Sequence, residues 1–338
     1  MKITEITIIN LQHFATQTTE LTSPGNNLSP EMKVFYDRNL IELASPKLVH
    51  GQFAVKKPIP ANNGKEIKFR KATPLAKVTT LLTEGVTPEG NKLDFTEFTA
   101  HVGQYGDYIE TSDMLDLTAI DPIIAETTKL LANQAAISLD TVDREALNAG
   151  ANVVYCPAGE TAVTSRSNLT KDSVLTSDVI MEVVAQLRAA NAPTIDGYYV
   201  AIVHPHVALD IMKDENWRKP HEYVDTDKVY KGEIGEYQGV RFIQSSEAKI
   251  IGKGTDGAPS NLAVYSTIFM GDGAYGTTEV EGGGLEMIIK QLGYGNDPLN
   301  QRASVGWKAS RVTTILIEDY LVRVESVSSK FSSKAVAN

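Results

Sequence analysis

The sequence has very few residues that form disulfides or bind metals, and it has no long hydrophobic run. Its 338 residues include one cysteine, Cys156, and six histidines. A lone cysteine cannot close an intrachain disulfide or hold zinc through sulfur by itself, so we expect a small buried thiol. The apolar runs 198–203 and 313–317 are far shorter than the roughly 20 residues of a membrane helix. The first residues are not a continuous apolar stretch of signal-peptide type, and we expect a protein made in cytoplasm.

Basic charge is also scarce. The chain has 32 lysines and arginines against 42 acidic residues, a net charge of −10. Tight binding to nucleic acid uses lysine and arginine to displace counterions, so this balance disfavours a DNA-binding role. The composition, 42% hydrophobic and 22% charged, is that of an ordinary globular protein and excludes disorder as the overall state.

The charges that are present are divided between two neighbouring segments. Residues 53–80 carry a net charge of +6, and residues 81–126 carry a net charge of −9. The basic residues of the first segment are Lys56, Lys57, Lys65, Lys68, Arg70, Lys71 and Lys77. Opposite charges lying so close along a chain indicate either pairing within it or an interface between copies.

The same region shows strand-like alternation. Polar and apolar residues alternate at 66–70 and 93–98, and turn residues interrupt the pattern at 62–64 and 85–90. This predicts a long two-stranded excursion with one thin apolar face. Because an isolated hairpin is marginal in water, the excursion should need a partner surface.

The remaining pattern predicts an α+β protein with one very long helix. Asp121 and Pro122 begin a helical repeat that continues to Gly150, about 40 Å at 1.5 Å per residue. Other predicted elements are a polar arm at 1–29, helices at about 29–44, 177–190 and 207–214, and strands at 197–203, 240–243, 263–265, 285–289, 303–309, 313–317 and 320–324. Residues 326–338 are expected to be a frayed end.

Motifs that would indicate catalysis or cofactor binding are weak. The G-x-G-x-x-G spacings at 252–257 and 271–276 have no helix directly after them, so flexible loops are the better interpretation. His204 and His206 flank Pro205; they could supply two metal ligands, but a strand-to-helix turn is favoured. No catalytic residue, cofactor or metal is assigned.

Several segments resemble one branch of the major capsid proteins of tailed bacteriophages, which have the Hong Kong 97-type fold. The similar segments are 43–50 (LASPKLVH), 64–71 (GKEIKFRK), 82–88 (LTEGVTP), 104–108 (QYGDY) and 117–122 (LTAIDP). The resemblance covers roughly residues 28–327 and is densest over 29–150. It implies a protein that assembles with copies of itself and is not an enzyme.

The resemblance also implies a domain map. The parts are an N-terminal arm at 1–50, an extended loop at 51–100, a peripheral domain at 101–150 and 276–330 with a spine helix at about 122–149, an axial domain at 151–275 and a C-terminal tail at 331–338. It implies hexamers and pentamers of an icosahedral virion shell, assembled in the host bacterial cytoplasm. The implied partners are a portal, a separate scaffolding protein, a decoration protein and double-stranded DNA that is enclosed without specific binding.

We hypothesise that the basic excursion lies on an adjacent subunit and meets its acidic segment or the start of its long helix. Charge would then set register and apolar residues would hold the contact. Besides the seven basic residues above, the contact candidates are Ile67, Phe69, Phe95, Glu84, Asp113, Asp116, Asp121 and Glu126. The alternative is that these charges are solvated faces of one strand pair, since most surface ion pairs contribute little.

Two other functions stay open at this point. One is a shell subunit of a cellular nanocompartment with the same fold, which would need a cargo-binding groove. The other is a soluble α/β enzyme that uses His204, His206 and nearby acids. Particle mass would separate a shell protein from an enzyme.

Overall fold

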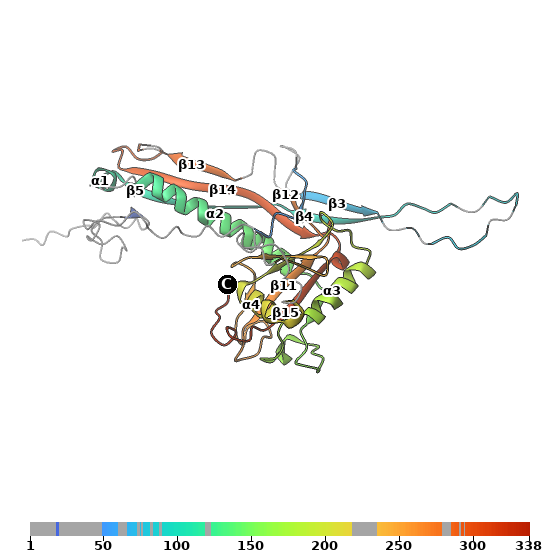
Figure 1. Ribbon diagram of the computed structural model, residues 1–338. Coiled ribbons are helices and arrows are strands. Elements are labelled where there is room, and N and C mark those ends of the chain that lie inside the picture. The colour runs from blue at the N-terminus through green and yellow to red at the C-terminus, as the bar shows by residue number, and fades with distance from the viewer. Residues whose placement is uncertain are drawn as a thin grey trace, which may run out of the picture. The chain divides into compact units, whose positions relative to one another are not determined.

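The computed structural model divides the chain into two compact units (Figure 1). Unit 1 comprises residues 1–45, 104–136 and 283–309, and unit 2 comprises residues 46–103, 137–282 and 310–338. The structure describes residues 18–19, 49–59, 66–72, 75, 77–81, 84–87, 90–118, 123–217, 235–278, 285–290, 292–293 and 295–338. Most of the predicted N-terminal arm, including the helix expected from Ser29, lies outside these residues.

Unit 1 is built on long antiparallel strands and a helix. Its elements are β1 (Thr18–Thr19), β5 (Gly103–Ser112), α1 (Asp113–Thr118), the first half of α2 (Ile123–Asn148), β13 (Glu286–Lys290) and the first half of β14 (Arg302–Ile315). Strand β14 lies between β5 and β13. A Cβ on Gly106 would lie 2.6 Å from the carbonyl oxygen of Trp307, so β5 and β14 approach closely only because residue 106 is glycine.

The long helix and the strands of unit 1 agree with the sequence pattern, with two differences. Helix α2 spans Ile123–Asn148, as the apolar repeat predicts. The strands predicted separately at 303–309 and 313–317 are one continuous strand, β14. Arg311 interrupts the apolar pattern there, but Asp143 pairs with it, so the strand continues through the charged residue. The short helix α1 was not predicted.

Unit 2 contains a seven-stranded mixed sheet, a pair of helices and a hairpin. The sheet consists of β6 (Val153–Tyr155), β15 (Leu321–Ser326), β11 (Val264–Met270), β7 (Tyr199–Val203), β9 (Val240–Gln244) and β8 (Gly235–Tyr237) in that order, with β10 (Ile250–Ile251) on β11. The other elements are the second halves of α2 and β14, β2 (Val55–Lys56), β3 (Glu66–Ala72), β4 (Phe95–His101), β12 (Tyr275–Thr278), α3 (Ser177–Ala189), α4 (Pro205–Lys213) and the 3-10 helices at Arg166–Asn168 and Glu318–Tyr320.

The core of unit 2 lies on both faces of the sheet. Alternate residues of β7 point to opposite faces, so Ala201 and Val203 pack with helices α3 and α4. Val200 and Ile202 pack on the other face with Leu147 near the end of α2. The fully buried strand β7 and helices α3 and α4 are where the sequence predicted them.

The end of the chain differs from the prediction. The last strand, which the resemblance implied for the peripheral part, pairs with β11 and β6 in the seven-stranded sheet. Residues 326–338 are not frayed: Ser328, Ser329, Phe331 and Asn338 all contact unit 2. Within the described residues, no helix is long and apolar enough to cross a membrane.

Candidate assembly surface

The predicted two-stranded excursion is present as a hairpin of β3 and β4. The strands pair antiparallel, with Phe69 opposite Phe98 and Arg70 opposite Glu97. Because side chains alternate along a strand, β3 places Lys68 and Arg70 on one face and Phe69 on the other. The hairpin therefore has one charged face and one apolar face, as the sequence predicted.

The charged face of the hairpin is paired within the chain. The guanidinium Nε of Arg70 lies 2.8 Å from Glu97, and the ammonium of Lys68 lies 3.5 Å from the same carboxylate. His101 and Glu66 are also opposite each other, and Nδ1 of His101 lies 3.3 Å from Oε1 of Glu66. Part of the contrast between the basic and acidic segments is thus satisfied inside one strand pair, which was the alternative to an inter-subunit charge contact.

The base of the apolar face packs on the chain itself. Phe69 is only 4% exposed, and its ring lies against Gly276 of β12, where a Cβ would approach Cε1 of the ring to 3.1 Å. Lys57 lies over the same ring, 5.9 Å from its centre. Phe69 is therefore buried by its own chain, and its predicted contact with an adjacent copy stays a prediction. Ile67 is half-buried, whereas Phe95 is half exposed.

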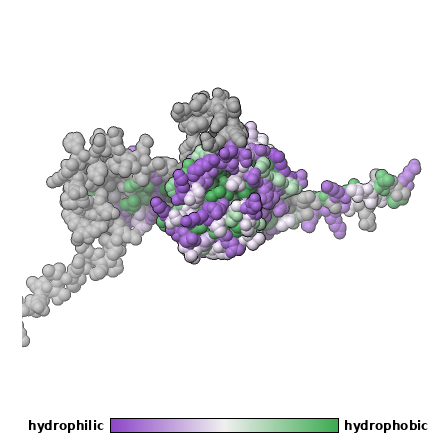
Figure 2. All heavy atoms as spheres, turned by 60° about the horizontal axis from the view of Figure 1, so that its bottom comes forward, coloured by the Kyte–Doolittle hydropathy of each residue, from purple (hydrophilic) through white to green (hydrophobic). Residues whose placement is uncertain are grey.

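Beyond β3 and β4 the excursion continues as extended chain (Figure 1). Several of its apolar side chains are exposed. Leu81 is 97% exposed, and the other members of this set, which we call the distal apolar residues, are Leu75, Val78, Val86 and Leu93. Figure 2 shows hydrophobic and hydrophilic residues interleaved along this thin extension, at the right of the view. Lys77 and Glu84 in the same stretch are exposed as well.

The structure describes only some of the other candidate contact residues. Lys56 is exposed in β2. Asp113 begins α1 and its carboxylate accepts a hydrogen bond from the Met114 backbone at 2.8 Å, which is helix-start electrostatics. The positions Lys65 and Asp121, and the side chains of Lys71, Asp116 and Glu126, lie outside the described part of the chain. Their predicted contacts stay predictions.

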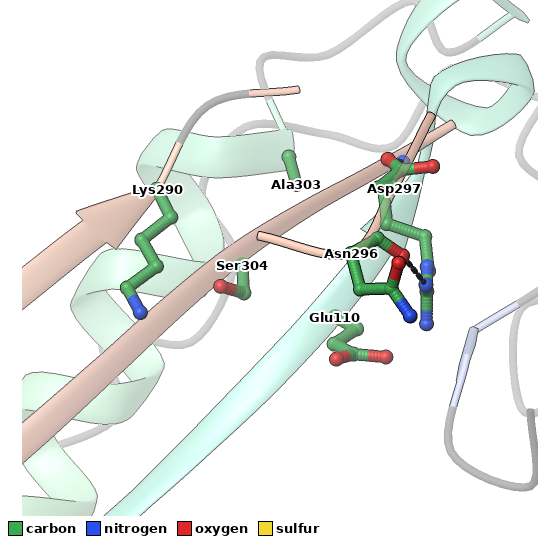
Figure 3. A pocket seen from close by; sticks show the side chains of 7 residues that line it. Glu110, Lys290, Asn296, Asp297, Ala303 and Ser304 are labelled. Atoms are coloured by element: carbon green, nitrogen blue, oxygen red, sulfur yellow. Dashed lines mark hydrogen bonds between the residues drawn. The ribbon is translucent and has the colours of Figure 1, made fainter. Parts of the chain in front are cut away.

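A hollow of about 270 Å³ in unit 1 is lined by acidic and basic side chains (Figure 3). Glu110 of β5 and Lys290 of β13 line it, and Arg302 donates to the carbonyl of Asn296 at 3.2 Å. The Asp297 carboxylate accepts from the Arg302 backbone at 2.8 Å, so it holds the start of β14. The described residues contain no group of three or more histidine, cysteine or acidic side chains suited to a metal.

The histidine pair has a structural role. His204 is the N-cap of α4 and accepts from the His206 backbone at 3.1 Å, which confirms the strand-to-helix turn. Burial lowers the pKa of His204 to about 4, so its ring is neutral at physiological pH. His206 lies 2.8 Å from the Tyr265 hydroxyl and stacks on Phe331. The glycine-rich stretch 252–257 is a loop, with Gly254 and Gly257 at positive φ, whereas the stretch 271–276 is a buried turn that ends in strand β12.

Sequence reasoning missed a buried polar cluster at the start of the excursion. His50 and Asp140 are fully enclosed and in contact, and Asp143 one helical turn further on pairs with Arg311. A signal was available, because Asp143 falls on the same face of the long helix as the buried Leu139 and Leu147. A charged residue on a buried helix face needs a partner.

Comparison with known proteins gives a consistent set of matches. The model of the phage capsid protein family matches residues 96–324, which are 229 of the 338 residues. No curated protein sequence matches the chain.

Solved structures with a similar fold come from several sources. The capsid of Ralstonia phage GP4 is 13% identical with a TM-score of 0.67, over 85% of this chain and 90% of that one. The cyanophage Pam1 capsid is 13% identical with a TM-score of 0.63, over 79% and 86%. An encapsulin complex from Synechococcus elongatus is 11% identical with a TM-score of 0.50, over 84% and 88%.

Proposed function

Because this chain belongs to the phage capsid protein family, it is a structural protein of a virion shell, and we propose that the excursion of each copy lies on an adjacent copy in that shell. The fold shared with phage capsids and the capsid family agree with self-assembly rather than catalysis. We propose further that copies form hexamers and pentamers around double-stranded DNA that they do not bind specifically. Assembly in the host cytoplasm with a portal, a separate scaffolding protein and a decoration protein completes the proposal.

The observation that carries the excursion contact is the exposure of the distal apolar residues. Single exposed hydrophobic side chains are ordinary on protein surfaces, but several along one segment that has no core of its own indicate an interaction site. Burying a side chain such as Leu81 completely would contribute about 1.5–3 kcal/mol. Contacts of this kind, repeated over every copy in a shell, support assembly.

Charge has a smaller part in this contact than the sequence alone suggested. Lys68 and Arg70 are already paired with Glu97, and exposed ion pairs typically contribute less than about 1 kcal/mol. Lys77 and Glu84 lie beyond the hairpin and are exposed, and we propose that they set the register on the adjacent copy. High salt should therefore slow assembly more than it weakens the finished contact.

The test removes two distal apolar residues at once. The double substitution Leu81→Ser and Val86→Ser should leave the unfolding free energy of the unassembled chain within about 0.5 kcal/mol of the parent, because both side chains are exposed. It should abolish particles of megadalton mass, as measured by light scattering and negative-stain electron microscopy. The matched control is Met181→Ser, an exposed apolar side chain on α3 that should assemble normally.

Two outcomes would contradict the proposal. Regular shells from the double variant would show that the distal apolar residues do not hold copies together. A parent protein that forms only small oligomers in every condition would favour the soluble enzyme. Microscopy of purified particles also separates the nanocompartment alternative, because shells filled with cargo protein differ from shells filled with DNA.

A further inference from the structure

Just before the excursion begins, buried hydrogen bonds fix the chain to helix α2. The Oδ1 atom of Asp140 accepts from the backbone nitrogens of Val49 at 3.1 Å and His50 at 2.9 Å. Its Oδ2 atom lies 2.7 Å from Nδ1 of His50. The hydroxyl of Tyr275 in β12 donates to the carbonyl oxygen of His50. Side chains from two remote elements thus hold both the backbone and the ring of His50.

A second carboxylate narrows the space around this point. Asp143 pairs with Arg311, whose Nε lies 2.9 Å from Oδ1, and it also accepts from the Thr313 hydroxyl. A Cβ on Gly51 would lie 2.6 Å from Oδ2 of Asp143 and closer still to Arg311. Because both groups are held in a buried ion pair, the chain can pass here only with glycine at position 51.

Stability alone does not explain these buried polar contacts. Buried ionic pairs are often no more stabilising than well-packed apolar residues of the same volume, because the charges must leave water. The Nε2 atom of His50 is buried without a hydrogen-bond partner, so an apolar ring would fill the same position without that penalty. What His50 adds is a directional contact to Asp140.

The excursion follows from this point after a few residues. Val55 and Lys56 pair with Gly276 and Thr277 in a short parallel ladder, and the Lys57 nitrogen donates to Thr277 at 3.2 Å. Phe69 then packs on Gly276. Both anchoring points involve β12, which also carries Tyr275, so the position of residues 49–51 fixes where the excursion starts.

We propose that Asp140, His50 and Tyr275 form a positioning cluster that fixes the direction in which the excursion is presented to the adjacent copy. The inference rests on the proposed excursion contact. In this inference, the role of the cluster is to orient the excursion for assembly. When the cluster is broken, the chain still folds, but the excursion points in many directions and shells become irregular.

The first experiment compares variants of the cluster with a core variant, and the stability of each is measured. Asp140→Asn replaces the charged acceptor that faces Nδ1 of His50 by an amide, and His50→Phe removes Nδ1. Both should lower the yield of regular shells at least tenfold. His50→Asn places an amide nitrogen where Nδ1 lies and should restore most of that yield. The matched control is Val203→Ala in the core of the seven-stranded sheet, which touches no member of the cluster. Its urea midpoint is compared with that of Asp140→Asn, and it should assemble normally.

The second experiment measures direction in the full-length chain before assembly. Spin labels on Thr99→Cys in β4 and Asp178→Cys in α3 report one distance within unit 2. Cys156 is buried, and burial raises the pKa of its thiol, so it does not compete for the label. The parent background and Val203→Ala should give a narrow distance distribution, whereas Asp140→Asn should give a broad or shifted one.

The outcomes separate the two proposals. Regular shells and an unchanged distance from Asp140→Asn and His50→Phe would overturn the positioning cluster and leave the excursion contact standing. Equal assembly defects in Val203→Ala would also overturn it, because the cluster would then act through stability alone. Regular shells from the Leu81 and Val86 double variant would instead remove the excursion contact on which the inference rests.

Discussion

The C-terminal segment, residues 327–338, and the distal part of the excursion, residues 75–94, differ in what they contact. The first is held on its own unit by side-chain hydrogen bonds. Asp210 of α4 accepts from the Ser328 hydroxyl and from both the nitrogen and hydroxyl of Ser329. Asn338 accepts from the Ile250 nitrogen at 2.8 Å and donates to Ala248.

The two segments have a similar share of apolar residues, five of twelve in 327–338 and seven of twenty in 75–94, yet the large hydrophobic side chains described in the distal excursion are exposed. Apolar content therefore does not decide which segment packs on its own unit. A buried acceptor such as Asp210, aimed at two consecutive serines, fixes a polar segment that looks frayed in the sequence. The distal apolar residues have no such acceptor and leave their surface for another molecule.

Among the changes that test this difference between the two segments, removing the Asp210 carboxylate should cause the largest loss of stability. Asp210→Ala removes the acceptor of both the nitrogen and the hydroxyl of Ser329, which should destabilise unit 2 by about 2–3 kcal/mol. Urea unfolding measures the loss, and hydrogen exchange at Ser329 shows whether the segment detaches. Asp178→Asn, an exposed carboxylate on α3, is the control and should change stability by less than about 1 kcal/mol. An unchanged exchange rate at Ser329 would show that Asp210 does not hold the segment.

Lowering the pH should cause a smaller loss of stability. Burial lowers the pKa of His204 to about 4 from the usual 6.5, so between these values the unfolded chain binds a proton that the folded chain does not. Stability should therefore decrease as the pH falls through this window, by roughly 1–2 kcal/mol after allowance for solvent screening. Tyr265 and His206 face this ring, and Asp210 raises the pKa of His206 against its burial.

The check is unfolding at a series of pH values for the parent and for His204→Asn. Asparagine keeps the N-cap of α4 but does not titrate, so the dependence on pH between 6.5 and 4 should become shallower. It should not vanish, because burial also lowers the pKa of His206. Identical pH profiles would show that another group causes the loss.

The smallest effect concerns the charged face of the hairpin. A double-mutant cycle with Arg70→Gln and Glu97→Gln should give a coupling energy below about 1 kcal/mol, because the Arg70 side chain is 65% exposed and that of Glu97 is 38% exposed. The coupling should decrease at high salt. A coupling of several kcal/mol, or one that salt does not change, would mean that the ion pair is shielded from solvent and that charge matters more to the excursion than its exposure indicates.

Local periodicity was enough to predict the elements that bury one face or all of their surface. Helix α2, strand β7 and the β3–β4 hairpin each carry a repeat that matches their burial. The distal apolar residues could be expected in outline, because a thin hairpin has too little core.

Other features depend on partners remote in sequence. The continuity of β14 requires Asp143, 168 positions from Arg311, and the docking of Ser329 requires Asp210, 119 positions away. The positioning cluster joins residues 90 positions apart at His50 and Asp140. No local pattern contains such pairs. What the sequence did show was an acid on a buried helix face, which indicates that a partner exists but not which residue it is.

The hairpin has a consequence for the chain before it meets other copies. In the described residues, β3 and β4 pair only with each other, so each has an outer edge whose backbone donors and acceptors could recruit a foreign strand. Natural proteins discourage such aggregation with charged side chains along the edge, lysine above all. Lys68 and Arg70 occupy this position on β3. We therefore expect Lys68 and Arg70 to discourage unwanted strand pairing between newly made chains before they assemble.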